Sequence, residues 1–144
     1  MKDLVLEGRV VFEKFLSKIK IFEAEEYQEI VNSNDVRVIS NGPNHIILIP
    51  RNFEAIRDII PDTKWNNTFT NAAFSRYQKQ KYTIYFILTK KESPAYNDKA
   101  TRKLSVIISP SGEYTCYDAY GIIIDINNVT KITGIAKGVF RQVK

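Results

Sequence analysis

The residues best suited to bind a charged ligand lie in the middle of the chain. The run Lys64-Trp65-Asn66-Asn67-Thr68 places the only tryptophan beside a cation, two amides and a hydroxyl. More aromatic and basic side chains follow closely, namely Phe74, Arg76, Tyr77, Lys79 and Lys81. An aromatic ring can stack on a nucleotide base while cations neutralise its phosphates and amides donate directed hydrogen bonds. The segment therefore predicts the binding of an anionic ligand rather than catalysis.

Two later segments contribute further candidates. Arg102 and Lys103 open a predicted strand, and they would reach the same surface if residues 82–89 and 102–109 pair. Asp118 and Asp125 flank a predicted turn near Gly121, where a carboxylate pairs with an arginine or caps the turn. The predicted ligand-binding residues are Lys64, Trp65, Asn66, Arg76, Tyr77, Arg102 and Asp118.

The same central residues also fit a purely structural role. Trp65, Phe69 and Phe74 are large enough to close one end of a hydrophobic core. Lys64 and Arg76 would then lay their aliphatic stems over these rings and keep their charges in water. Replacing Trp65 by alanine separates the two hypotheses, because a core residue would unfold the chain and a ligand-stacking residue would not.

Several kinds of chemistry lack their residues in this chain. His45 is the only histidine, so no two-histidine metal site can form, and we predict that it is a strand residue beside a turn. Cys116 is the only cysteine and is predicted to be a buried, inert thiol. Neither glycine-rich phosphate-loop motif occurs, and the acidic run 23–26 is predicted to be a solvated helix face. We therefore predict no catalytic residues, metal or cofactor.

Charge and length describe a single domain, residues 1–144, with an uneven distribution of cations. Of the net charge of +5, residues 51–103 hold 11 Lys or Arg against 5 Asp or Glu, whereas residues 1–50 hold 6 against 8. Such a patch steers phosphates, nucleic acid or acidic partners toward it. No apolar stretch approaches the roughly 20 residues of a membrane helix. We predict a cytoplasmic protein without a membrane partner.

Hydrophobic spacing predicts an α+β fold, with an antiparallel sheet of about five strands and helices on one of its faces. An N-terminal amphipathic helical segment, 11–31, and a C-terminal helix, opening at Asn127 and extending to Val139, are expected. Short helices are expected at 53–60 and 71–79. The predicted strands are a hairpin, 36–39 and 45–49, and a meander, 82–89, 102–109 and 114–118.

The order of these residues resembles small proteins of bacteriophages and mobile elements that carry a Lys-Trp-Cys-Thr-like motif. The resemblance covers residues 36–125, and the matching positions are Thr63-Lys64-Trp65, Phe74, Tyr77, Ile84-Tyr85-Phe86-Ile87, Arg102-Lys103-Leu104 and Tyr117-Asp118. Asn66 replaces the cysteine of that motif, so any thiol chemistry of the family would be missing here. The resemblance implies a phage origin and accessory work on the host.

The function predicted from these observations is inhibition of a host defence process by a phage-encoded protein. It would act by non-catalytic binding of a host protein or of an anionic, nucleotide-type ligand. Two alternatives stay open. One is a nucleic-acid-binding module, whose affinity would fall steeply with salt. The other is a histidine-independent phosphodiesterase or transferase that uses Lys64, Tyr77, Arg102 and Asp118.

Overall fold

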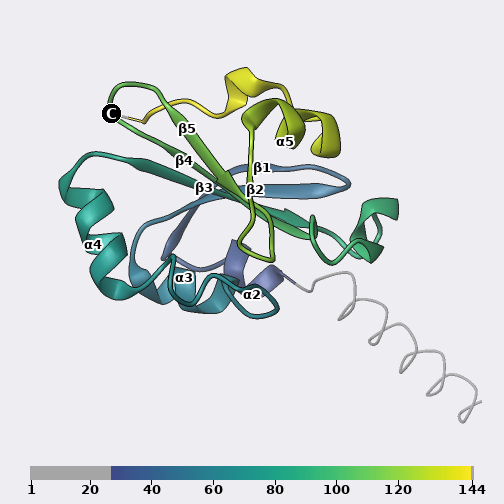
Figure 1. Cartoon of the computed structure of the whole chain (residues 1–144). Helices are drawn as coiled ribbons and strands as arrows, with labels where there is room; N and C mark the ends of the chain where they lie inside the picture. The colour runs from purple at the N-terminus through teal and green to yellow at the C-terminus, as the bar shows by residue number, and fades with distance from the viewer. Residues whose placement is uncertain (1–26, 144) are drawn as a thin grey trace, which may run out of the picture.

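A six-stranded antiparallel sheet forms the centre of the protein, with helical segments above and below it (Figure 1). The structure, a computed structural model, describes residues 27–143. Its strands follow one another in chain order from one edge of the sheet to the other. The strands are β1 (Val36–Asn41), β2 (His45–Pro50), β3 (Thr83–Thr89), β4 (Lys103–Ile108), β5 (Tyr114–Tyr117) and β6 (Ile123–Ile124).

The helical segments are short, and most begin at a side-chain cap. Asn52, Thr70 and Asp125 each accept a hydrogen bond from the third following main-chain N–H, which satisfies one of the unpaired donors of a first helical turn. The segments are α2 (Gln28–Val31), α3 (Phe53–Ile59), α4 (Asn71–Lys79), η1 (Pro94–Asn97), α5 (Ile126–Thr133) and η2 (Lys137–Val139).

The central strand β3 is buried at every position, because both faces of the sheet are covered. Ile84, Phe86 and Leu88 point into a core shared with α3 and α4. Tyr85 and Ile87 point into a second core shared with α5 and Phe140. Figure 1 shows the two helical layers on opposite sides of the sheet. The prediction that the helices pack on one face is therefore wrong.

The α+β class and most predicted elements are confirmed, with two differences in detail. The sheet has six strands rather than about five, because residues 123 and 124 pair with the edge of β5. The C-terminal helix ends at Thr133, where Gly134 takes a left-handed conformation (φ 71°) that glycine adopts without strain. The apolar residues Ile135 and Val139 therefore follow the helix and pack on the same face from an irregular segment.

The predicted N-terminal amphipathic segment lies mostly outside the described residues. Its last part is α2, which packs Ile30 and Val31 against the core formed with α3. Tyr27, which precedes α2, is buried in that core. This end of the predicted segment thus contributes apolar surface to the helical layer below the sheet.

Candidate functional site

Trp65 is a core residue. Its side chain is 0% exposed, its ring stacks on Phe86 at a centroid distance of 5.6 Å, and its Nε1 donates a hydrogen bond to the main-chain oxygen of Asp118 at 2.7 Å. Both ring faces and the polar edge are thus occupied within the protein. Trp65 offers no surface on which a ligand could stack, and the structural role considered for it from the sequence is the one observed.

The hydrogen bond of Trp65 belongs to a contact between two distant segments. The main-chain N–H of Lys64 donates to the oxygen of Ala119 at 2.7 Å. Gly121 lies so close to this segment that a Cβ on it would stand 3.4 Å from the oxygen of Lys64, and its φ of 78° also favours glycine. Residues 62–65 are therefore held directly beside the loop that follows β5.

Asp118 gives that loop its shape. Its carboxylate oxygen Oδ1 accepts hydrogen bonds from the N–H groups of Tyr120 and Ile122, at 2.9 and 3.0 Å. The carboxylate is buried and caps the turn, one of the two structural roles expected for it. It supports the residues around the site and does not itself line the cavity described below.

A third segment joins the first two through Arg102. The N–H of Ala119 donates to the oxygen of Ala100 at 2.8 Å, which ties the loop after β5 to the start of β4. The Nε of Arg102 donates to the oxygen of Tyr96 at 2.7 Å, and its guanidinium lies 3.9 Å from the centroid of the Tyr96 ring. This cation–π contact and hydrogen bond fix the direction of the guanidinium.

These three segments enclose a cavity of about 230 Å³, which we call the cation cavity. It is lined by Asp62, Lys99, Arg102, Lys103, Ala119 and Tyr120. Lys103 is 7% exposed, and its Nζ donates to the oxygens of Ile59 and Pro61 at 2.9 and 2.7 Å. Among the residues that the structure describes, three cations and one carboxylate thus line this cavity. Lys103 is buried and Arg102 half-buried, whereas Asp62 and Lys99 are exposed. Charges interact more strongly at the buried positions than at an open surface.

The structure brings only part of the predicted ligand-binding set to the cation cavity. Arg102 lines it, Asp118 supports it, and Lys64 and Asn66 are exposed on the segment that follows Asp62. Lys99 and Tyr120 were not predicted, because nothing in the local pattern distinguishes them from other loop residues.

Arg76 and Tyr77 lie elsewhere. Tyr77 lines a different cavity, together with Thr83 and Ile84, and the Arg76 guanidinium lies 5.8 Å from its ring centroid. The cation cavity includes Lys103, which pairs with Leu88 near the other end of β3. The four residues considered for a phosphodiesterase or transferase therefore do not line one common cavity.

The predictions for His45 and Cys116 are confirmed. His45 is the first residue of β2, directly after the hairpin turn, and burial lowers the pKa of its imidazole below the usual 6.5. Cys116 is buried on β5. Burial, with a smaller contribution from the nearby Asp125 carboxylate, raises the pKa of the Cys116 thiol to about 11, so the thiol is protonated and unreactive at neutral pH.

Two other kinds of site are absent from residues 27–143. No group of three or more His, Cys, Asp or Glu side chains there is arranged to hold a metal ion. No helix in that range has the length and apolar character to cross a membrane.

Comparisons with protein-family models, with curated proteins and with solved structures found no match to this chain.

Proposed function

We propose that this protein binds a small anionic ligand of the nucleotide type in the cation cavity, without catalysing a reaction. The observation that carries the proposal is the convergence of Lys99, Arg102 and Lys103 on one cavity, where Asp62 is the one carboxylate among the lining residues that the structure describes. A dianionic phosphate would compensate the excess positive charge of this cavity. Hydrogen bonds from the cations that already line the cavity would offset the cost of removing water from the phosphate.

The cations of the cavity have complementary roles in this proposal. Arg102 presents a planar fork of N–H donors whose orientation is set by Tyr96, which suits bidentate contact with a phosphate. Lys103 supplies a charge held in position by two main-chain oxygens. Lys99 lies on an exposed loop and would move onto the bound anion.

The size of the cavity indicates which part of the ligand enters. Pockets that enclose a whole drug-sized molecule usually measure about 300–1,000 Å³, whereas the cation cavity measures about 230 Å³. The phosphate end of a nucleotide would therefore lie inside, and the base would lie at the rim. Tyr120, which lines the cavity and is 46% exposed, is the aromatic residue placed to contact that base.

The biological role proposed here is that of a phage-encoded accessory protein that inhibits a host defence process by sequestering such a ligand. The resemblance to phage and mobile-element proteins, carried by Thr63-Lys64-Trp65 and the strands that follow, supports this setting. A binding protein that only sequesters its ligand needs a charged cavity and no catalytic group, which is consistent with the residues at this cavity.

The test is isothermal titration of the full-length protein with inorganic phosphate, AMP, ATP and a cyclic dinucleotide. We expect at least one nucleotide to bind, and Arg102→Gln to weaken its affinity by about tenfold or more, as loss of a charge-assisted bidentate contact does. Arg57→Gln is the matched control, since Arg57 is an exposed arginine paired with Glu54 on α3. Absence of binding at millimolar ligand, or equal affinity of the two variants, would refute the proposal.

A host protein is the second candidate ligand, and a specific surface favours it. Beside the cation cavity, the segment after Asp118 exposes three large apolar side chains: Tyr120 (46%), Ile122 (59%) and Ile123 (68%). Neighbouring exposed apolar residues of this size are typical of protein contact surfaces. Affinity purification from host lysate with the wild type and with Ile122→Lys tests it, and a host protein retained by both would count against this surface.

A further inference from the structure

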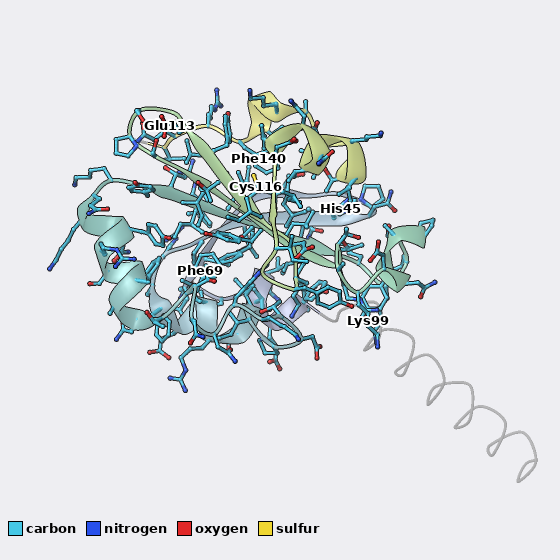
Figure 2. The ribbon with its side chains drawn as sticks, in the orientation of Figure 1. His45, Phe69, Lys99, Glu113, Cys116 and Phe140 are labelled. Atoms are coloured by element: carbon cyan, nitrogen blue, oxygen red, sulfur yellow. The ribbon has the colours of Figure 1, made fainter. Side chains whose placement is uncertain are left out.

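A second positively charged region lies at the other end of β3 from the cation cavity. Two cavities, of about 280 and 530 Å³, share Arg37 and Val143 as lining residues. Arg51 lines the first and Arg141 lines the second. We call these two adjoining cavities together the basic groove. In Figure 2, Lys99 marks the cation-cavity end of the molecule and Glu113 marks the opposite end.

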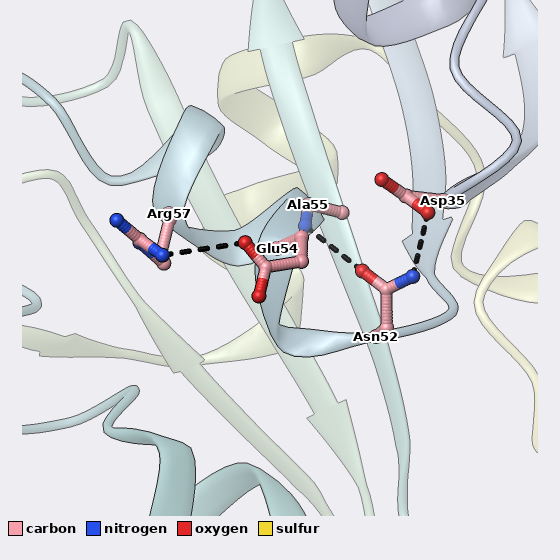
Figure 3. Close-up of polar contacts among 5 residues, drawn as sticks. All are labelled: Asp35, Asn52, Glu54, Ala55 and Arg57. Atoms are coloured by element: carbon pink, nitrogen blue, oxygen red, sulfur yellow. Dashed lines mark hydrogen bonds and ion pairs between the residues drawn. The ribbon is translucent and has the colours of Figure 1, made fainter.

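The arginines of the basic groove come from three separate elements whose main chains are fixed. Arg37 lies on β1, opposite Ile49 of β2. The N–H of Arg51 donates to the oxygen of Asp35 at 2.7 Å. The next residue, Asn52, joins the Asp35 carboxylate to the first turn of α3 (Figure 3). The main chain at Arg51 is thus held by its own hydrogen bond to Asp35 and by those of the next residue, Asn52.

The C-terminal residues that line the two cavities are attached to β3 and to the segment before it. The hydroxyl of Tyr85 donates to the oxygen of Arg141 at 2.6 Å. The N–H of Val143 donates to Oγ1 of Thr83 at 3.1 Å, and the side-chain amide of Gln142 donates to the oxygen of Lys81 at 2.8 Å. This part of the chain is therefore attached along β3 and holds Arg141 facing the same groove as Arg37.

The charges of the basic groove are available to a ligand. Arg37, Arg51 and Arg141 are exposed, and within residues 27–143 none of them pairs with a carboxylate. No aspartate or glutamate is among the described residues that line either cavity. Lys79 and Lys81 are exposed and lie in the chain between Gln78 and Tyr82, which line the first cavity.

Aromatic side chains line the same groove. Tyr77 and Tyr82 both line the first cavity and are half-buried, with ring centroids 5.3 Å apart. Their rings are supported from behind by the core that contains Phe74. Burial raises the pKa of the Tyr77 phenol above its usual 10.0, so the ring is uncharged at neutral pH and can contact a base without repelling the phosphates.

We propose that the basic groove binds single-stranded nucleic acid, with phosphates at the three arginines and a base against Tyr77 and Tyr82. The first cavity combines two arginines with two aromatic rings, and the second adds a third arginine. Cations and aromatic rings on one surface suit the phosphates and bases of a single strand. An acidic peptide would use the cations and leave the aromatic lining without a function. The groove is separate from the cation cavity, so this proposal does not depend on nucleotide binding there.

The test measures the binding of fluorescently labelled oligo(dT) and oligo(U) of twenty nucleotides by the full-length protein, using fluorescence anisotropy at several salt concentrations. We expect the double variant Arg37→Gln/Arg51→Gln to lose about tenfold or more in affinity. The slope of log K against log salt should become shallower by about 0.7 for each phosphate contact removed. Arg57→Gln/Lys91→Gln removes the same charge at exposed residues that line neither the groove nor the cation cavity, and should leave the slope unchanged.

A third variant separates base contact from charge. Tyr82→Leu keeps an apolar side chain against the core and removes the aromatic ring, so affinity should fall while the salt slope is retained, as expected when only a base contact is lost. No binding at 50 mM salt would overturn the proposal. Equal weakening by the groove and control double variants would overturn it too, as would tighter binding of poly-glutamate than of oligo(dT). Nucleotide titration of the same groove variants reports on the cation cavity independently.

Discussion

The cation cavity and the basic groove are both positive, but their charges are held in different ways. In the cation cavity, main-chain oxygens hold Lys103 and Arg102 at their charged ends. In the basic groove the arginines are held through their main chains, and among the residues that the structure describes no side-chain hydrogen bond or ion pair is found for Arg37, Arg51 or Arg141, which are all exposed. Held charges favour one small anion of defined shape, whereas mobile charges favour a polyanion that can be contacted in several arrangements.

A substitution in the core beside the cation cavity should lower the free energy of unfolding more than any other change considered. Trp65→Ala removes a ring that is 0% exposed and the donor that satisfies the oxygen of Asp118. We expect the free energy of unfolding to fall by about 3–5 kcal/mol, measured by urea denaturation. A variant that loses nucleotide binding and keeps its full stability would show instead that Trp65 contacts the ligand.

Removing one cation from each region shows how much each cation contributes to the stability of the fold. Lys103→Met leaves the oxygens of Ile59 and Pro61 without the Nζ donor, so unfolding should become easier by about 1–3 kcal/mol. Arg51→Gln changes an exposed side chain and should alter stability by no more than about 0.5 kcal/mol. Thermal and urea denaturation of both variants measure this difference, and equal losses would contradict the comparison.

Salt should weaken binding at the two regions to different extents. A single strand held at three arginines should lose affinity with a slope of log K against log salt of about −2, because a polyanion releases condensed counterions when it binds. A mononucleotide carries no such layer of counterions, so its affinity should fall less between 50 and 200 mM salt. Parallel titrations of both ligands decide this, and equal slopes would remove the distinction between the regions.

The smallest expected effect lies at His45, which lines neither region. Its imidazole has a lowered pKa in the folded state because it is partly buried, so the unfolded chain binds the proton more readily. Above pH 6.5, the pKa in the unfolded chain, the imidazole is neutral in both states and does not destabilise the fold. Below it, the unfolded chain takes up the proton first, so the free energy of unfolding falls. The free energy of unfolding should decrease slightly from pH 7 to pH 5.5, and His45→Gln should reduce that decrease.

Local patterns were sufficient for most of the elements. The helix predicted at 71–79 has the same bounds as α4, since the residues that end it lie next to it in the chain. The strands of the meander agree to within a residue. By contrast, β6 has only two residues and forms because they pair with the edge strand β5. This pairing cannot be predicted from the few residues of β6 themselves.

The sequence does indicate that both faces of the sheet are covered. A strand covered on one face alternates apolar and polar residues, whereas a strand covered on both faces is apolar throughout. Residues 83–89 are apolar or threonine throughout, and 106–108 are all apolar. Such unbroken runs are typical of strands buried on both sides. The helical spacing toward Val139 overstated the last helix, since Gly134 ends it and the later apolar residues reach the same core without being helical.

The sequence by itself determined the α+β class, the positions of most strands and helices, the inert character of Cys116 and the excess of cations in the middle of the chain. Those properties depend on composition and on neighbours in the chain. Only the tertiary structure decided that Trp65 is core, that Arg102 and Lys103 share a cavity with Asp62 and Tyr120, and that Arg37, Arg51 and Arg141 face one groove. These groupings come from strand register and loop packing between segments far apart in the chain, and side-chain types alone do not specify them.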